Sequence, residues 1–112
     1  MTCIFCQIVA RELPQPILYE DEHVAVFKDI NPAAPVHLLI VPKMHLDSLN
    51  AFDEKTAEIG ARMFLAAKRM AEAEGIQTGY RVQINNGREA GQVVRHLHMH
   101  LMGGWSRKPA KK

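Results

Sequence analysis

The stretch VVRHLHMHLM, residues 93–102, constrains the fold of this chain more than any other segment. Its side chains alternate, and alternation with a period of two is typical of a β-strand. His96, His98 and His100 would then share one face of the strand, with Leu97 and its apolar neighbours on the other. Because the apolar face has to be covered, the segment predicts a sheet with a packing layer on one side and histidines facing a cavity, a groove or water.

The rest of the chain supplies more strands and one helix. Apolar stretches at 17–19 and 24–27 flank an acidic turn and predict a hairpin, and the unbroken run at 38–41 predicts a strand covered on both faces and ended by Pro42. Residues 80–85 alternate as a further strand. These patterns predict an α+β domain with an antiparallel sheet of about five strands and one main helix.

A helical period runs from Asp53, the expected N-cap, to Glu74, with Gly75 as the expected stop. The spacing is typical of a packing surface and does not indicate a cofactor site. Its apolar stripe consists of Ile59, Met63, Phe64, Ala67, Met70 and Ala71.

Length and charge exclude several classes of protein. A chain of 112 residues predicts one domain, over residues 1–104, with a basic tail at 105–112 that is flexible at its end. Without the four basic residues of that tail the net charge of +2 becomes −2, a poor match for a nucleic-acid-binding protein. No apolar run approaches the ~20 residues of a membrane span. The N-terminus lacks a signal-peptide pattern, so we expect a cytoplasmic protein without a membrane partner.

The three histidines could serve as metal ligands, as sheet residues or as catalytic groups. Same-face residues of a strand are about 6.5–7 Å apart, so three rings on one strand span about 13 Å and cannot share one ion without bending the strand. Ordinary hydrogen-bonded sheet histidines are the plainest alternative. An imidazole that titrates near neutrality also suits nucleophilic or acid–base chemistry. The glycine-containing turn NNGREAGQ before the strand could hold a phosphate against its backbone amides.

Cys3 and Cys6 form a Cys-x-x-Cys pair near the N-terminus. A structural disulfide is not expected in the cytoplasm, and the strand and helix that flank a thioredoxin-type redox motif are absent from the pattern. Half of a metal site, a redox pair and two reduced thiols remain open, and a zinc site would need two further ligands.

Three segments together resemble the histidine-triad (HIT) family. GQVVRHLHMHLMGG is similar to its His-x-His-x-His signature, FKDINPAAPVHLLIVPKMH to an upstream block, and CIFCQIVARELP to its N-terminus. The match covers residues 3–104, and the Gly103-Gly104 ending resembles the Hint branch. The resemblance implies a HIT-like fold, with the sheet continued across a homodimer and the long helix near the interface.

The resemblance also implies a purine-nucleotide hydrolase or transferase that cleaves the phosphorus bond of nucleoside monophosphate conjugates, without a catalytic cofactor. By position, His98 is the nucleophile that forms a nucleotidyl-histidine, and His100 contacts the phosphate oxygens. His37 is either part of the active-site network or a buried orienting group. The alternative function is a nucleotide-binding or scaffold protein with vestigial hydrolysis.

Further positions are implied for the ligands. Asp29 matches the ribose-binding carboxylate, although it is also suited to a turn before Asn31. Where many Hint proteins have a serine, this chain has Val93, so a hydroxyl that helps protonate the leaving group is missing. Other implied nucleotide contacts are Ile4, Phe5, Ile8, Phe27, Ile30, Asn85, Gly91 and Gln92, and a structural zinc would be held by Cys3, Cys6, His45 and His96.

Overall fold

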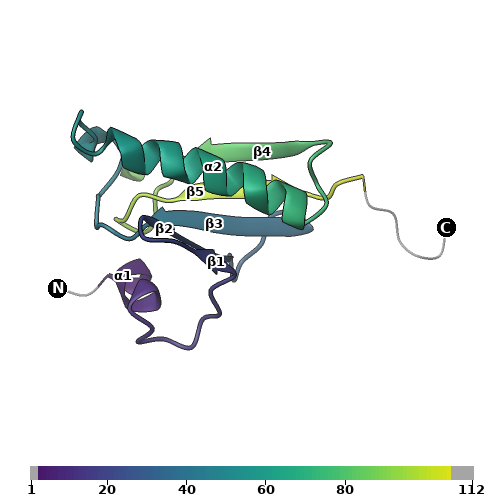
Figure 1. The fold of residues 1–112 in the computed structure, drawn as a ribbon, viewed down its shortest axis with the longest axis horizontal. Helices are drawn as coiled ribbons and strands as arrows, with labels where there is room; N and C mark the ends of the chain where they lie inside the picture. The colour runs from purple at the N-terminus through teal and green to yellow at the C-terminus, as the bar shows by residue number, and fades with distance from the viewer. Residues whose placement is uncertain (1–2, 107–112) are drawn as a thin grey trace.

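The computed structural model describes residues 3–106, so nearly all of the basic tail lies outside the described residues. A five-stranded antiparallel sheet with the order β1-β2-β3-β5-β4 forms the centre, and one long helix, α2, lies along it (Figure 1). This confirms the predicted fold class. In chain order the elements are α1 (Ile4–Val9), β1 (Tyr19–Glu20), β2 (Val24–Lys28), β3 (Val36–Pro42), the 3-10 turn η1 (Leu49–Ala51), α2 (Ala57–Ala73), β4 (Tyr80–Ile84), the 3-10 turn η2 (Arg88–Ala90) and β5 (Met99–Gly103).

The central strands of the sheet are covered on both faces. Side chains of β2, β3 and β5 pack with α2 in one apolar cluster, and Phe5 and Ile8 of the short helix α1 pack with Phe27 and Leu39 in another. Every residue of β3 is buried, as predicted for a strand between two layers. None of the described helices is long and apolar enough to span a bilayer.

Helix α2 begins later than predicted. The Asp53 carboxylate accepts hydrogen bonds from the backbone amides of Lys55 and Thr56 at 2.9 and 3.1 Å, so it closes a turn, and the helix starts at Ala57. The prediction that Gly75 stops the helix is confirmed, because its φ of +71° is a left-handed conformation that glycine adopts without strain.

Phe64 is wrongly assigned to the buried stripe of α2. Its side chain is 63% exposed, while Met63 beside it is 2% exposed. The buried positions follow spacings of three and four residues, and Phe64 is rotated by about 100° from Met63 around the helix axis. The buried positions are Ile59, Met63, Ala66, Ala67, Met70 and Ala71.

The histidine strand is shorter than predicted, because β5 begins only at Met99. The residues before it leave the ladder, and the Leu97 amide donates to the carbonyl of Leu46 at 2.6 Å. The alternation still holds for packing: Leu97, Met99 and Leu101 all belong to the cluster beneath α2. The histidines therefore point away from α2, two of them from irregular backbone.

Candidate active site and metal cluster

A cavity of about 560 Å³ lies between α1 and the sheet. The cavity has an apolar wall and a polar end, which is the arrangement of a site for a ligand with a flat apolar part and a charged part. It brings together eleven residues that the sequence singled out, namely Ile4, Phe5, Ile8, Phe27, Asp29, Ile30, Asn85, Gly91, Val93, His98 and His100.

The apolar wall is built by α1. Phe5 and Ile8, three residues apart, face the sheet and are buried. The Phe5 ring meets Phe27 of β2 edge-on, with centroids 5.5 Å apart, and the His98 ring in the same way at 5.2 Å. Helix α1 therefore connects the wall of the cavity directly to one of its histidines.

His98 is held with one nitrogen free. Its Nδ1 lies 2.8 Å from the backbone carbonyl oxygen of His96. Because a carbonyl oxygen only accepts, Nδ1 carries the proton, and the neutral ring keeps an unprotonated Nε2. The side chain is nearly buried and lines the cavity, so the imidazole has the tautomer that a nucleophile needs.

His37 and His100 form a chain with a defined direction. The Ala33 amide donates to His37 Nδ1 at 2.9 Å, so the neutral His37 ring carries its proton on Nε2. That nitrogen lies 2.9 Å from Nδ1 of His100, which accepts and leaves the His100 proton on Nε2. Burial, with the neighbouring His98 and His37 rings, lowers the pKa of His100 below its usual value. His100 is therefore a neutral hydrogen-bond donor toward the cavity.

His37 itself does not line the cavity, which favours the orienting role left open for it. Asp29 closes a turn and also lines the cavity. Its Oδ1 accepts from the Asn31 amide at 2.8 Å, while Oδ2 lies 3.4 Å from His37 Nε2 at the cavity. Asp29, His37 and His100 could also be grouped as metal ligands, but the Ala33 hydrogen bond fixes the proton on the His37 nitrogen that would have to bind the ion.

The loop before the histidines is fixed by Gln92. Its side chain accepts from the Gly87 amide at 2.8 Å and donates to the carbonyls of Asp47 and Val94 at 2.6 and 2.9 Å. Gln92 was predicted to contact the nucleotide, but it does not line this cavity. Its side-chain amide stabilises the loop instead. Gly91 has a φ of +89°, and Val93 is 91% exposed at the cavity's edge.

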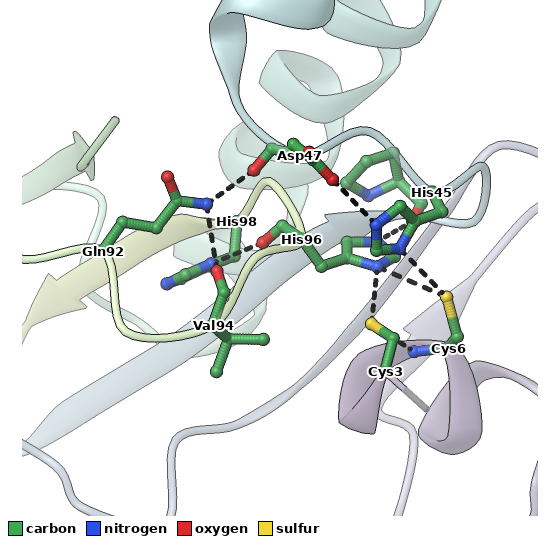
Figure 2. Close-up of polar contacts among 9 residues, drawn as sticks. Cys3, Cys6, His45, Asp47, Gln92, Val94, His96 and His98 are labelled. Carbon is green, nitrogen blue, oxygen red and sulfur yellow. Dashed lines mark hydrogen bonds and ion pairs between the residues drawn. The ribbon is translucent and has the colours of Figure 1, made fainter. Parts of the chain in front are cut away.

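A second cluster joins the N-terminus to the histidine segment. Cys3, Cys6, His45 and His96 each offer one donor atom, and all four donors lie within 4.8 Å of one another (Figure 2). The Sγ atoms of Cys3 and Cys6 are 3.3 and 3.6 Å from Nδ1 of His96, and Cys6 Sγ is 3.3 Å from Nδ1 of His45. In a tetrahedral zinc site, neighbouring N and S ligands are about 3.5 Å apart.

The hydrogen bonds behind the two imidazoles suit a metal. His96 donates through Nε2 to the Pro42 carbonyl at 2.8 Å, and His45 through Nε2 to Asp47 at 3.0 Å. Both rings therefore keep an unprotonated Nδ1 toward the thiols, as metal-binding histidines do. Burial and the neighbouring Cys3 thiol raise the pKa of Cys6 to about 11, and a bound cation would reverse that effect. The two cysteines are free thiols.

Sequence reasoning missed the groups that orient these rings. The Ala33 amide and the Pro42 carbonyl belong to the backbone, which any residue would supply, so no side-chain pattern indicates them. Asp47 could have been found, because it lies two residues after a candidate ligand. Leu13, Gln15 and Leu39 also line the cavity without a distinctive signal.

Comparison with known proteins gives matches over most of the chain. A family model described as "HIT domain" matches residues 10–107. The purine nucleoside phosphoramidase of Escherichia coli is 43% identical over 90% of this chain and 86% of its own, and a 14 kDa zinc-binding protein of Zea mays is 46% identical over 90% and 80%. The solved structure of a HIT family hydrolase from Clostridium thermocellum is 50% identical, covers 96% of this chain and 95% of that one, and superimposes with a TM-score of 0.91.

Proposed function

The chain belongs to the HIT family, and from that premise we propose that it is a purine-nucleoside phosphoramidase that works through a covalent nucleotidyl-histidine. Relatives named as hydrolases support a HIT-type nucleotide hydrolase. The finer assignment depends on one observation above all: His98 lines the cavity with its Nδ1 proton directed at the His96 carbonyl, which leaves Nε2 free to attack.

The nucleotide fits the cavity in one direction. A purine lies against the apolar wall of Phe5, Ile8 and Phe27, and the ribose hydroxyls donate to the Asp29 carboxylate. The phosphate then reaches His98 and His100, with backbone amides around Gly91 on its other side. An apolar wall discriminates little between adenine and guanine, so the proposal covers both.

The reaction has two steps. Nε2 of His98 attacks the α-phosphorus, the bond from phosphorus to the leaving nitrogen breaks, and the amine departs with a proton taken from water. A water molecule then attacks the same phosphorus and the bond to His98 breaks, so the sum is conjugate plus water giving amine plus nucleoside monophosphate. The Nε2 proton of His100 donates to a phosphate oxygen as negative charge grows in each transition state.

Turnover of adenosine phosphoramidate tests this proposal. We expect hydrolysis that His98→Ala abolishes, together with an adduct of the wild-type protein, one nucleotidyl group heavier, in rapidly quenched samples analysed by mass spectrometry. His23→Ala is the matched control, because His23 lies outside the cavity lining and pairs with Glu22. Retained activity in the His98 variant would overturn the proposal.

Val93 supports a second candidate, a nucleotide-binding or scaffold protein with vestigial hydrolysis. The exposed valine brings no hydroxyl to the phosphate end of the cavity, so the leaving amine has one proton source fewer. Tight binding of the nucleotide without turnover would favour this reading over the enzyme.

We also propose that the cluster of two cysteines and two histidines binds a structural zinc ion. Two thiolates and two neutral imidazoles with supporting hydrogen bonds are a complete tetrahedral set, which leaves no open position for a substrate. The site therefore stabilises α1 and takes no part in the reaction. One bound zinc per chain by elemental analysis, lost in Cys3→Ser, is the expected result.

A homodimer is proposed from the edge of the sheet. Strand β4 is an edge strand of the described sheet and pairs with β5 on one side. Tyr80 and Val82 on it are 38% and 42% exposed. An unprotected edge with apolar side chains favours pairing with another strand, and a second copy of β4 would continue the sheet. Phe64 on α2 is exposed as well. Analytical ultracentrifugation should give twice the monomer mass for the wild-type protein and the monomer mass for Val82→Lys.

A further inference from the structure

A second cavity lies next to the proposed active site. It measures about 820 Å³ and is bordered by the segment around η1 on one side and the loop of η2 on the other. Gly91 and Val93 line both cavities, so the two meet at the end where the nucleotide phosphate is placed. Of the nucleotide contacts proposed above, only the backbone amides around Gly91 border this space.

Two arginines give the second cavity its charge. Arg88 of η2 and Arg95 before the histidines both line it, and neither side chain makes a hydrogen bond or ion pair with another residue between 3 and 106. Asp47 is the carboxylate in the lining, and it already accepts a hydrogen bond from His45. The cavity therefore offers two guanidinium groups that are available to a ligand.

The walls of this cavity are held in place before a ligand arrives. Gln92, which is buried, ties the Gly87 amide on one side to the Asp47 carbonyl on the other. The Leu49 amide donates to Asn86 Oδ1 at 2.7 Å and adds a second link between the same two segments. A preorganised cavity binds with a smaller loss of conformational entropy than a mobile surface.

We infer that this cavity receives the leaving group of the conjugate and that Arg88 and Arg95 select a leaving group with negative charge. The inference rests on the proposed function. Gly91 and Val93 line both cavities, so a group bonded to the α-phosphorus at that end can extend from the nucleotide cavity into the second one. Guanidinium groups bind carboxylates and phosphates with paired, charge-assisted hydrogen bonds, so either anion fits.

Three conjugates of similar size test the charge preference. They are the phosphoramidates of adenosine monophosphate with β-alanine, β-alaninamide and 1,3-diaminopropane, whose leaving groups end in an anion, a neutral amide and a cation. Each is cleaved by the same exchange of a phosphorus–nitrogen bond for a bond to His98. We expect kcat/KM for the β-alanine conjugate to exceed that for the amide by about tenfold, the cumulative effect of two partly exposed ion pairs.

The arginine variants locate the preference. The ratio between the anionic and the neutral conjugate falls toward one in Arg88→Gln combined with Arg95→Gln. The ratio stays at the wild-type value in the control variant Arg81→Gln. The wild-type Arg81 guanidinium stacks over Trp105, away from this cavity. Equal kcat/KM for the three conjugates, or a preference that survives in the double variant, would overturn the inference. Diadenosine triphosphate, whose leaving group is adenosine diphosphate, extends the test to a phosphate anion, and its kcat/KM should also fall in the double arginine variant.

A failure of the proposed function would look different. The protein would then leave unsubstituted adenosine phosphoramidate intact, whereas a failure of this inference alone leaves that substrate cleaved and removes only the charge preference. Calorimetry with the His98→Ala variant measures the affinities of the same three conjugates in the absence of cleavage. An affinity order that ignores charge there would overturn the inference independently.

Discussion

His98 and His96 are joined by a hydrogen bond of 2.8 Å from Nδ1 of the first to the backbone carbonyl of the second. The ring of His96 faces Cys3 and Cys6, so the proposed nucleophile is held by the backbone of a proposed metal ligand. Helix α1 makes a second connection, because Phe5 lies between the two cysteines in sequence and contacts both histidine rings.

Removing zinc should therefore weaken the fold and nucleotide binding while sparing the chemical step. Free zinc at 100 times its dissociation constant stabilises a protein by about 2.7 kcal/mol, or roughly 10 °C in Tm for a domain of this size. We expect a chelator to lower Tm by that order and to raise KM, because α1 loosens, with kcat within about twofold. Thermal unfolding and steady-state kinetics check this. Cys6→Ser should no longer respond to the chelator, and an immediate loss of kcat would indicate a catalytic metal instead.

The direction of the Ala33–His37–His100 chain predicts the effect of replacing His37. His37→Ala leaves Nδ1 of His100 without its donor, so the donating tautomer of His100 is no longer fixed, and we expect kcat to fall about 100-fold. His37→Gln retains an N–H group near the same place and should recover part of the loss. The pH profile of kcat separates this role from packing, since a positioning role shifts the profile. Equal losses in both variants with an unchanged profile would refute it.

Stability should fall in mild acid. Burial lowers the pKa of His100 in the folded protein, relative to about 6.5 in the unfolded chain. The unfolded state therefore binds protons first as the pH falls, and the stabilisation that is complete above pH 6.5 is lost progressively below it. Urea denaturation between pH 7.5 and 5 measures the slope. His100→Asn should reduce that slope and His23→Gln should preserve it. A flat profile in the wild-type protein contradicts the assignment.

Gly91 and Gly79 provide a matched pair for the loop that borders both cavities. A Cβ at either position has room, but only Gly91 has a positive φ, at +89°. Gly91→Ala should cost about 1–2 kcal/mol, the penalty of a left-handed conformation for other residues, and should raise KM because the loop amides move. Gly79→Ala should change the free energy of unfolding by less than about 0.5 kcal/mol. Equal effects at the two positions would mean that backbone conformation does not explain them.

The features that could be predicted from the sequence are those that depend on side-chain periodicity and on contacts between residues close in the chain. The alternation of Leu97, Met99 and Leu101 indicates the face of the sheet beneath α2, and it holds even where the backbone leaves the ladder. Cys3 and His96 are 93 residues apart, and no local pattern brings them together. Only the family resemblance suggested that cluster. The proton positions depend on backbone groups such as the Ala33 amide, which carry no residue-specific signal.

Val93→Ser tests whether the missing hydroxyl limits the reaction. Val93 is 91% exposed, so the exchange should alter the free energy of unfolding by less than about 0.5 kcal/mol. A serine at the edge of both cavities brings an O–H group to the leaving nitrogen. We expect kcat for an alkylamine phosphoramidate to rise about tenfold, less than the roughly 100-fold of a well-positioned general acid, because the residue is exposed. Val93→Ala removes the same bulk without a hydroxyl and should leave kcat unchanged. The gain in kcat should be smaller for leaving groups that depart without a proton, because they do not need protonation by the hydroxyl. An increase of the same size in the alanine variant would assign the effect of Val93 to steric obstruction instead.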